Sequence, residues 1–334
     1  MKFQIYCDKD CTYNETLAVS GAGSFFFHYL DPYLYVTDEG TSSNSVLKIY
    51  DMSDPRGPVL ASTTSLPNGS GAVHPRCKGN LLFIPYRNSK KLGIWDVSDR
   101  TNPTMLSETA VAFAPNGVAI IGSLAAVCFN ENFLQTKIAE AWDVSNPSSP
   151  SLAHSYNGSK LGYTIRASHG NFFITGQNSS GGPQYLSALD GSSFSLLDTT
   201  ATAVAPSGTG AGRMLEINAA GTLAFSAGSN GDGSIYTWDL SNLSNLTYVA
   251  STPAIGQTTC GAYKEDVDRL YIGGTAGISI LDTSNPSAIT LAGSISTSGE
   301  SVTDAACIDD GCAGFVWGQG TGAAIHLRGT PPIS

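Results

Sequence analysis

Leu92–Asp99 has the sequence LGIWDVSD, and the chain repeats this stretch along most of its length. Leu47–Asp54 has LKIYDMSD, and Ser234–Asn242 has SIYTWDLSN. The aspartate of the pattern recurs at intervals of 45, 47, 47, 49 and 43 residues, at Asp51, Asp96, Asp143, Asp190, Asp239 and Asp282. A period in the forties is typical of folds in which one supersecondary unit is stacked many times.

Each unit contains four strand-like segments separated by turn-forming residues. In the second unit these segments are Gly71–His74, Leu81–Tyr86, Leu92–Val97 and Thr104–Leu106. Short β-rich runs broken by Gly, Asn, Asp, Ser or Pro indicate an all-β protein, and no long segment shows the apolar period of a helix. A single four-stranded unit cannot bury both of its faces, so units of this kind pack side by side in a ring. The sequence therefore predicts a β-propeller of four-stranded antiparallel blades.

Glycines open the first strand of every unit and predict seven blades: Gly23, Gly71, Gly117, Gly162, Gly212, Gly261 and Gly299. We expect one domain, residues 1–334, with blades at 21–66, 67–112, 113–158, 159–207, 208–256, 257–297 and 298–330 plus 1–20. The last unit ends at TPPIS before a fourth strand, which would leave an edge unpaired. Thr16–Ser20 is in the right position to supply that strand, so we expect the N-terminal segment to close the ring.

The composition excludes two classes of partner. The 334 residues are 41% hydrophobic and 13% charged, with a formal net charge of −10. An acidic protein with only 17 Lys plus Arg repels phosphate backbones, so we expect no nucleic-acid partner. Apolar runs such as Leu124–Phe129 are too short to cross a bilayer, so we expect no membrane insertion.

The seven cysteines fall into two groups. Cys77, Cys128 and Cys260 stand singly in strand-like sequence, where a small buried thiol is the ordinary role. Cys7 with Cys11, and Cys307 with Cys312, flank predicted hairpin turns where a local disulfide is geometrically possible. A metal site would require both close pairs to converge, and we predict neither a metal nor a cofactor.

The repeated pattern L-x-I-[YW]-D-x-S-[DN]-x-x-x-P, preceded by segments such as YLYVTD and LLFIPY, resembles the LVIVD-repeat β-propeller family over nearly the whole chain. The resemblance implies a propeller, and it suggests a surface or exported protein, because that family occurs mostly on uncharacterised bacterial proteins of those kinds. The Trp-Asp pair is also similar to WD repeats, but their Gly-His dipeptide is absent from every unit. The match weakens in the fourth unit, where Asp190-Gly191-Ser192 lacks the proline, and in the last unit.

The repeated aspartates are predicted to be architectural. Asp and Ser side chains at the end of a strand can hydrogen-bond the backbone of the following turn. The same role in nearly every blade indicates structure, whereas a catalytic carboxylate would be expected in one place. We expect Trp95, Trp142 and Trp238 to fill the spaces between blades.

A search for chemistry finds neither a G-x-S-x-G nucleophile elbow nor an H-E-x-x-H metal helix. We therefore predict no enzyme and no catalytic residue. Polar residues of the predicted inner strands could instead line one mouth of the central channel and bind a small ligand: His74, Arg166, Arg213, Glu300 and Asp304. The alternative is that these side chains pair with one another or with channel water.

The chain is rich in Ser, Thr, Gly and Asn and poor in Lys, as in proteins that work outside cells, yet MKFQIYCDKDC lacks an apolar signal region. Either a virion component or a chain given without its leader would reconcile these facts. We predict a structural display module on an exterior surface, virion or cell envelope. It would recognise a protein or glycan, or neighbouring structural proteins of an assembly, through loops on one face: Thr41–Ser45, Asn178–Pro183 and Ser229–Gly233. The alternatives are an intracellular protein-interaction scaffold and a propeller hydrolase or lyase with its site at the central channel.

Overall fold

A computed structural model describes residues 13–18, 25–38, 45–54, 57–66, 71–178, 182–202, 214–227, 233–252, 258–264, 268–274, 277–295, 302–309, 313–319 and 324–329. For 13–18 and for the last three of these ranges the description covers the backbone alone. Within the described ranges all regular secondary structure consists of β-strands. No helix long and apolar enough to cross a membrane is found there.

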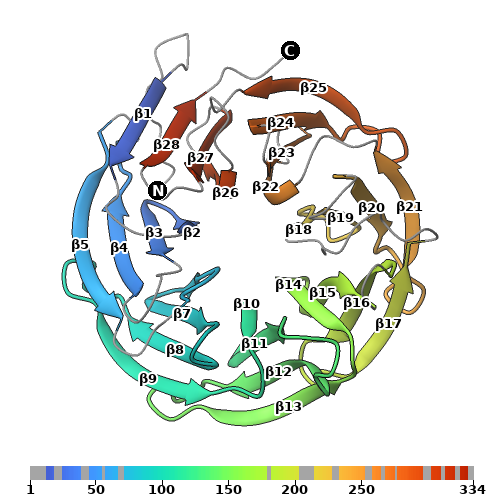
Figure 1. Cartoon of the computed structure of the whole chain (residues 1–334), viewed down its shortest axis with the longest axis horizontal. Coiled ribbons are helices and arrows are strands. Elements are labelled where there is room, and N and C mark those ends of the chain that lie inside the picture. Colours follow the sequence, from blue (N-terminus) through green and yellow to red (C-terminus); the bar gives the residue numbers. More distant parts are fainter. Residues whose placement is uncertain are drawn as a thin grey trace.

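The strands are arranged as a ring of antiparallel sheets around an open centre (Figure 1). Six blades are built from four consecutive strands each, which pair in sequence order. Blades 1 to 3 consist of β2 (Phe25–Leu30), β3 (Tyr33–Asp38), β4 (Ser45–Asp51) and β5 (Val59–Leu66); β6 (Arg76–Lys78), β7 (Leu81–Tyr86), β8 (Lys91–Asp96) and β9 (Thr104–Ala110); and β10 (Pro115–Ile121), β11 (Leu124–Phe129), β12 (Lys137–Asp143) and β13 (Ser151–Asn157).

Blades 4 to 6 have the same order. They consist of β14 (Leu161–Ser168), β15 (Asn171–Gln177), β16 (Gln184–Asp190) and β17 (Leu196–Ala201); β18 (Met214–Ile217), β19 (Leu223–Ala227), β20 (Ile235–Asp239) and β21 (Thr247–Thr252); and β22 (Thr258–Lys264), β23 (Arg269–Gly274), β24 (Gly277–Asp282) and β25 (Thr290–Ile295). The prediction of an all-β propeller with four-stranded antiparallel blades is confirmed.

The two ends of the chain share one further sheet, the composite sheet. It has the order β1-β28-β27-β26, from β1 (Tyr13–Ala18), β28 (Ala324–Gly329), β27 (Ala313–Gln319) and β26 (Val302–Asp309). In it β1 pairs antiparallel with β28, from Tyr13 opposite Gly329 to Ala18 opposite Ala324. The outer strand therefore lies about three residues earlier than the Thr16–Ser20 segment expected from the sequence. The sequence predicted seven blades, but the structure has six blades that each consist of four consecutive strands. A seventh blade would be present only if the composite sheet is counted as one.

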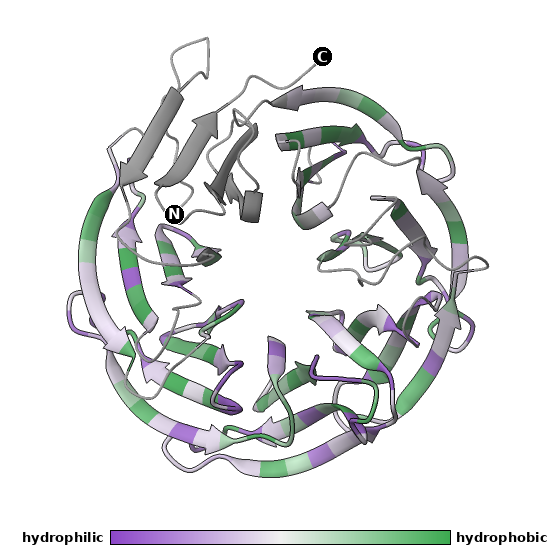
Figure 2. Cartoon of the chain, viewed as in Figure 1, coloured by the Kyte–Doolittle hydropathy of each residue, from purple (hydrophilic) through white to green (hydrophobic). Residues whose placement is uncertain are grey.

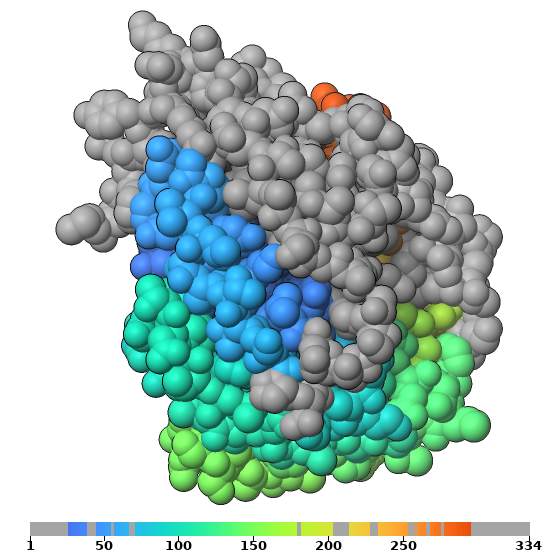
Figure 3. Space-filling view, turned by 60° about the vertical axis from the view of Figure 1, so that its left-hand side comes forward, coloured from blue at the N-terminus to red at the C-terminus, as the bar shows by residue number. Residues whose placement is uncertain are grey.

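The hydrophobic core lies between neighbouring blades. One cluster joins Leu47 and Ile49 of blade 1 to Leu82, Ile84 and Trp95 of blade 2, all at most 3% exposed. Equivalent clusters join blades 2 and 3, blades 3 and 4, blades 4 and 5, and blades 5 and 6. Figure 2 shows hydrophobic residues along the middle strands, and in the space-filling view the first blades adjoin one another without a gap (Figure 3). Each blade is thus stabilised mainly by its neighbours.

The strand order gives the ring two distinct faces. One face, the loop face, carries the connections between second and third strands and those between successive blades. The opposite face, the turn face, carries the hairpins between first and second strands and the turns between third and fourth strands. This follows because successive antiparallel strands end alternately on opposite sides of a sheet.

If the composite sheet closes the ring as a seventh blade, removal of residues 1–18 should destabilise the whole protein. The deletion would leave β28 as an unpaired edge, so we expect a single cooperative unfolding transition at a clearly lower temperature. Calorimetry of the shortened protein measures this. Removal of residues 1–12 alone keeps β1 and serves as the control. An unchanged melting temperature after the longer deletion would contradict closure by β1.

Candidate functional site

The first strand of each blade lies nearest the central opening (Figure 1). In every blade, one position of this strand pairs with the third residue of the second strand. In four blades that position is polar, and the residues are His28, Arg76, Arg166 and Glu216. Blades 3 and 6 have Ala119 and Ala262 there. The shared register places these residues at one level around the channel, and we call the four polar ones the channel layer.

Arg166 and Glu216 form an ion pair between blades 4 and 5. The Arg166 Nη2 atom lies 2.9 Å from Glu216 Oε1, and Arg166 Nη1 also donates to the Ile165 carbonyl at 3.2 Å. The two side chains are 24% and 21% exposed, so water weakens the attraction and its contribution to stability is modest. The pair nevertheless fixes the position of both charged groups at the channel wall.

Arg76 extends from blade 2 toward blade 1. Its guanidinium donates to the Pro75 carbonyl at 2.9 Å and to the Phe27 carbonyl of β2 at 3.5 Å. A second polar link runs through three blades, because Arg87 donates to Asn116 Oδ1 and Asn116 Nδ2 donates to the Tyr163 carbonyl. The inner strands are therefore joined by side chains as well as by apolar packing.

His28 is the neutral member of the channel layer. Burial, reinforced by the positive charges of Arg76 and Arg166, lowers the pKa of His28 to about 3. The imidazole is consequently uncharged at neutral pH and can donate one hydrogen bond and accept another.

The five predicted ligand-binding residues have different outcomes. Arg166 lies in the channel layer. His74 does not lie in an inner strand, contrary to the prediction. It sits at a bend before β6, with a φ of 40°, and its ring packs on Phe26 of blade 1 at 4.4 Å. Blade 2 has only an isolated bridge, Ala72 to Tyr86, where the strand was expected.

Arg213 and Glu300 lie outside the described residues. Asp304 belongs to β26, whose backbone alone is described. Sequence reasoning missed His28, Arg76 and Glu216. His28 and Arg76, like Arg166, lie five residues before the second strand of their blade, which is a signal that the sequence contains. Glu216 lies seven residues before β19, so it matches the others only when the strands are aligned in register.

The repeated aspartates each complete a turn. In all six copies, Oδ1 accepts a hydrogen bond from the backbone N–H two residues later, at 2.8–3.0 Å: Asp51, Asp96, Asp143, Asp190, Asp239 and Asp282. Hydrogen bonds from Ser98 lower the pKa of Asp96, and bonds from Ser192 and Ser193 hold the pKa of Asp190 well below its usual range. These carboxylates accept hydrogen bonds within turns, as the architectural interpretation predicts.

The tryptophans and single cysteines lie where the sequence analysis expected them. Trp95 and Trp238 are buried between blades, and Trp95 Nε1 donates to the Tyr86 hydroxyl at 2.8 Å. Cys128 and Cys260 are buried and Cys77 is partly buried. Burial raises the pKa of both Cys77 and Cys128 to about 12, so neither is a thiolate nucleophile at neutral pH. Among the described residues no three His, Cys, Asp or Glu side chains are grouped to hold a metal ion.

The ring of four-stranded blades and its polar channel define a β-propeller. Two stretches, 142–158 and 268–297, match the LVIVD repeat family model, so this propeller contains LVIVD repeats, and the resemblance seen in the sequence is confirmed. No curated protein sequence matches the chain.

Solved structures with the same architecture have varied roles. The β-propeller domain of Cps50 (Swd1) from Myceliophteria thermophila has a TM-score of 0.71 at 12% identity, over 94% of this chain and 99% of that one. Hydrazine synthase of Kuenenia stuttgartiensis gives 0.74 at 12% identity, over 95% and 98%. A chain of a mitotic checkpoint complex gives a TM-score of 0.72 at 13% identity, over 98% of this chain and 94% of that one. At such identities the likeness establishes the fold alone.

Replacing His28 should reduce the pH dependence of stability. In the folded protein the pKa of His28 is about 3, whereas in the unfolded chain it is near 6.5, so below about pH 6.5 the unfolded state binds the extra proton. Stability attributable to His28 is therefore present above that pH and is lost as the pH falls toward 3. Between about pH 7.5 and 5.5 the wild type should lose about 1 kcal/mol more than His28→Gln. Urea unfolding at both pH values measures the difference, and parallel losses in the two proteins would refute the assignment.

Proposed function

We propose that the protein is a non-enzymatic binding module on an exterior surface, virion or cell envelope, which recognises a partner through the loop face. The observation that carries this proposal is that loops of successive blades on this face are bonded to one another. Such a surface is ordered before a partner arrives, which reduces the entropic cost of binding.

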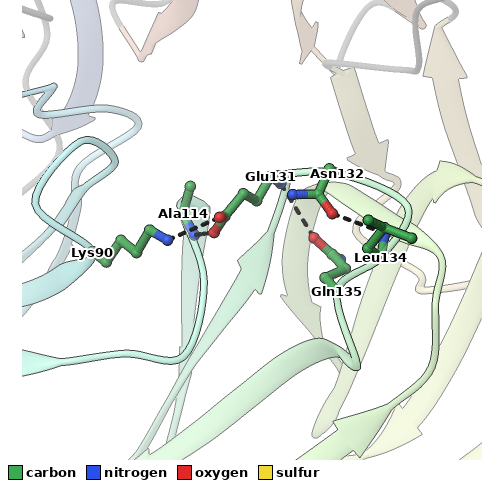
Figure 4. Close-up of polar contacts among 6 residues, drawn as sticks. All are labelled: Lys90, Ala114, Glu131, Asn132, Leu134 and Gln135. Atoms are coloured by element: carbon green, nitrogen blue, oxygen red, sulfur yellow. Dashed lines mark hydrogen bonds and ion pairs between the residues drawn. The ribbon is translucent and has the colours of Figure 1, made fainter.

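The first of these bonds joins blades 2 and 3. Lys90 lies in the turn between β7 and β8, and Glu131 lies in the loop between β11 and β12. The Lys90 Nζ atom is 2.8 Å from Glu131 Oε1 (Figure 4). The other carboxylate oxygen of Glu131 accepts the Ala114 N–H at 3.1 Å, in the connection between β9 and β10. One side chain therefore ties three separate loops together.

A buried amide fixes the same loop from beneath. Gln135 is 1% exposed, and its Nε2 donates to the Phe129 carbonyl at 3.1 Å and to the Lys160 carbonyl at 2.7 Å. Its Oε1 accepts the Glu131 N–H at 3.2 Å (Figure 4). Because Lys160 precedes blade 4, the loop is attached to both neighbouring blades.

The fixed loop presents an apolar side chain. Leu134 is 89% exposed, the largest value among the exposed large hydrophobic residues described, and its N–H donates to Asn132 Oδ1 at 2.8 Å. An aliphatic group displayed on a rigid polar loop gains free energy when a partner covers it. This arrangement favours a protein partner over a glycan for this face.

The predicted loops Thr41–Ser45, Asn178–Pro183 and Ser229–Gly233 fall largely outside the described residues. A hydrogen bond connects the two ends of the loop Asn178–Pro183, because the Asn178 N–H donates to the Pro183 carbonyl at 3.3 Å. All three connect second to third strands in the chain order, and their described ends lie at the loop face.

Leu134→Asp should weaken attachment to the partner surface by roughly tenfold or more, because a charge would replace an apolar contact. Fluorescent protein binding to isolated particles or envelopes measures this. Leu291→Asp is the control, since Leu291 is 61% exposed on the outer strand β25. Equal binding by both variants and the wild type would exclude Leu134 as a contact.

Localisation tests the exterior part of the proposal. Immunogold labelling should find the protein on particles or envelopes. The rival is an intracellular interaction scaffold, for which all seven cysteines would stay reduced. Cytoplasmic protein with seven free thiols under denaturing conditions would contradict the proposal.

The enzyme alternative places a site at the central channel. It predicts turnover of a glycan, ester or phosphoester that is lost when Arg166→Met and Glu216→Gln are combined. We expect no turnover by the wild type, and robust turnover abolished by the double substitution would overturn the proposal.

A further inference from the structure

The turn between third and fourth strands breaks the repeat at one blade. In five blades the outer strand begins eight residues after the repeated aspartate, as from Asp143 to Ser151. In blade 4 it begins six residues after Asp190, at Leu196. Leu196 pairs with Leu189, the residue before Asp190, whereas in blade 3 the residue before Asp143 pairs with Leu152, nine residues after Asp143. By this register the turn of blade 4 is three residues shorter, at the place where the proline is also absent from the sequence.

Turns of normal length contact the preceding blade. Ser107 of β9 donates to the Pro147 carbonyl in the turn of blade 3, at 2.6 Å. Asp198 of β17 accepts the Leu246 N–H in the turn of blade 5, at 2.7 Å. Both residues lie opposite the position two residues before the repeated aspartate of their own blade.

The residue at this register in blade 3 is His154, which pairs with Ala141. Its neighbour is the shortened turn of blade 4, and a groove of about 480 Å³ opens there instead of a contact. The groove is lined by residues that include Ile121, Leu124, Asp143, Ala153, His154 and Ser192. Its lining residues place it on the turn face, between β13 and the turn that leads into β17.

The wall formed by the short turn is fixed. Asp190 Oδ1 accepts the N–H groups of Ser192 and Ser193 at 3.0 and 2.8 Å. A side chain at Gly191 would bring its Cβ within 1.9 Å of the Gly170 carbonyl oxygen, so only glycine allows this close approach. The groove therefore exists before any ligand binds.

The groove has few polar side chains, and the most important are Asp143 and His154. Asp143 Oδ1 accepts the Ser145 N–H at 2.9 Å, which lowers the pKa of Asp143 and keeps the carboxylate ionised at neutral pH. That bond leaves Oδ2 as a hydrogen-bond acceptor. The His154 imidazole provides ring nitrogens for hydrogen bonding, and Ile121, Leu124 and Ala153 supply aliphatic surface.

We propose that this groove binds a neutral sugar of one or two residues. The volume fits a ligand of that size. A carboxylate accepts hydrogen bonds from neighbouring sugar hydroxyls, and aliphatic side chains pack on the C–H face of the ring. An anionic ligand would be repelled by Asp143 and Asp190. The site is on the face opposite Leu134, so it does not depend on the proposed function of the loop face.

Saturation-transfer NMR with the methyl glycosides of glucose, galactose, mannose, N-acetylglucosamine and fucose tests the proposal. At least one should receive magnetisation from the wild type. Asp143→Asn keeps the turn acceptor but removes the charge, and it should weaken binding by roughly tenfold or more. His154→Ser, which introduces the residue found at 107, should do the same.

Asp96→Asn makes the same change in blade 2, where the turn is of normal length, and should leave binding unchanged. Circular dichroism checks that every variant folds. The proposal is overturned if none of the five glycosides binds the wild type or if all variants bind equally well. Putrescine, a diamine that Asp143 could attract by charge alone, is tested by the same NMR measurement, and binding of putrescine without binding of any glycoside would also overturn the proposal.

Discussion

Packing between neighbouring blades is the interaction on which the rest of the structure depends. A four-stranded sheet has two faces, and in blade 2 both are apolar: Ile84 packs toward blade 1 and Ile94 toward blade 3. Neither face can be covered by the blade itself, so each blade needs a neighbour on both sides, and only a complete ring gives every blade two neighbours. This packing also fixes the position of the groups that the two faces carry, from the loop around Glu131 to the groove beside His154.

Features that depend on one repeat unit could be predicted from sequence. The aspartate turn is an example, because Asp96 and Ser98 are two residues apart and their hydrogen bond is local. The apolar runs around Leu82 and Ile94 likewise identify strands without knowledge of their neighbours. Since every unit repeats these signals, strand order and the ring follow from a single well-preserved copy.

Features that depend on contacts between units could not be predicted in the same way. Arg166 and Glu216 are 50 residues apart, and their pairing requires the exact register of two inner strands. His74 was misplaced because blade 2 replaces the expected strand by a bend. The groove follows from three missing residues after Asp190, yet its size is set by side chains of another blade. The missing proline after Asp190 was visible in the sequence, but the groove beside it depends on the three-dimensional arrangement of two blades.

Native-state hydrogen exchange of Ile94→Ala tests the dependence on interblade packing most directly. Ile94 is fully buried between blades 2 and 3, and its truncation should cost about 2–5 kcal/mol. If the blades stabilise one another around the ring, slow amides of β23 in blade 6 should lose as much protection as those of β7. A loss confined to blades 2 and 3, with β23 unchanged, would show that blades are stable independently and would contradict this account.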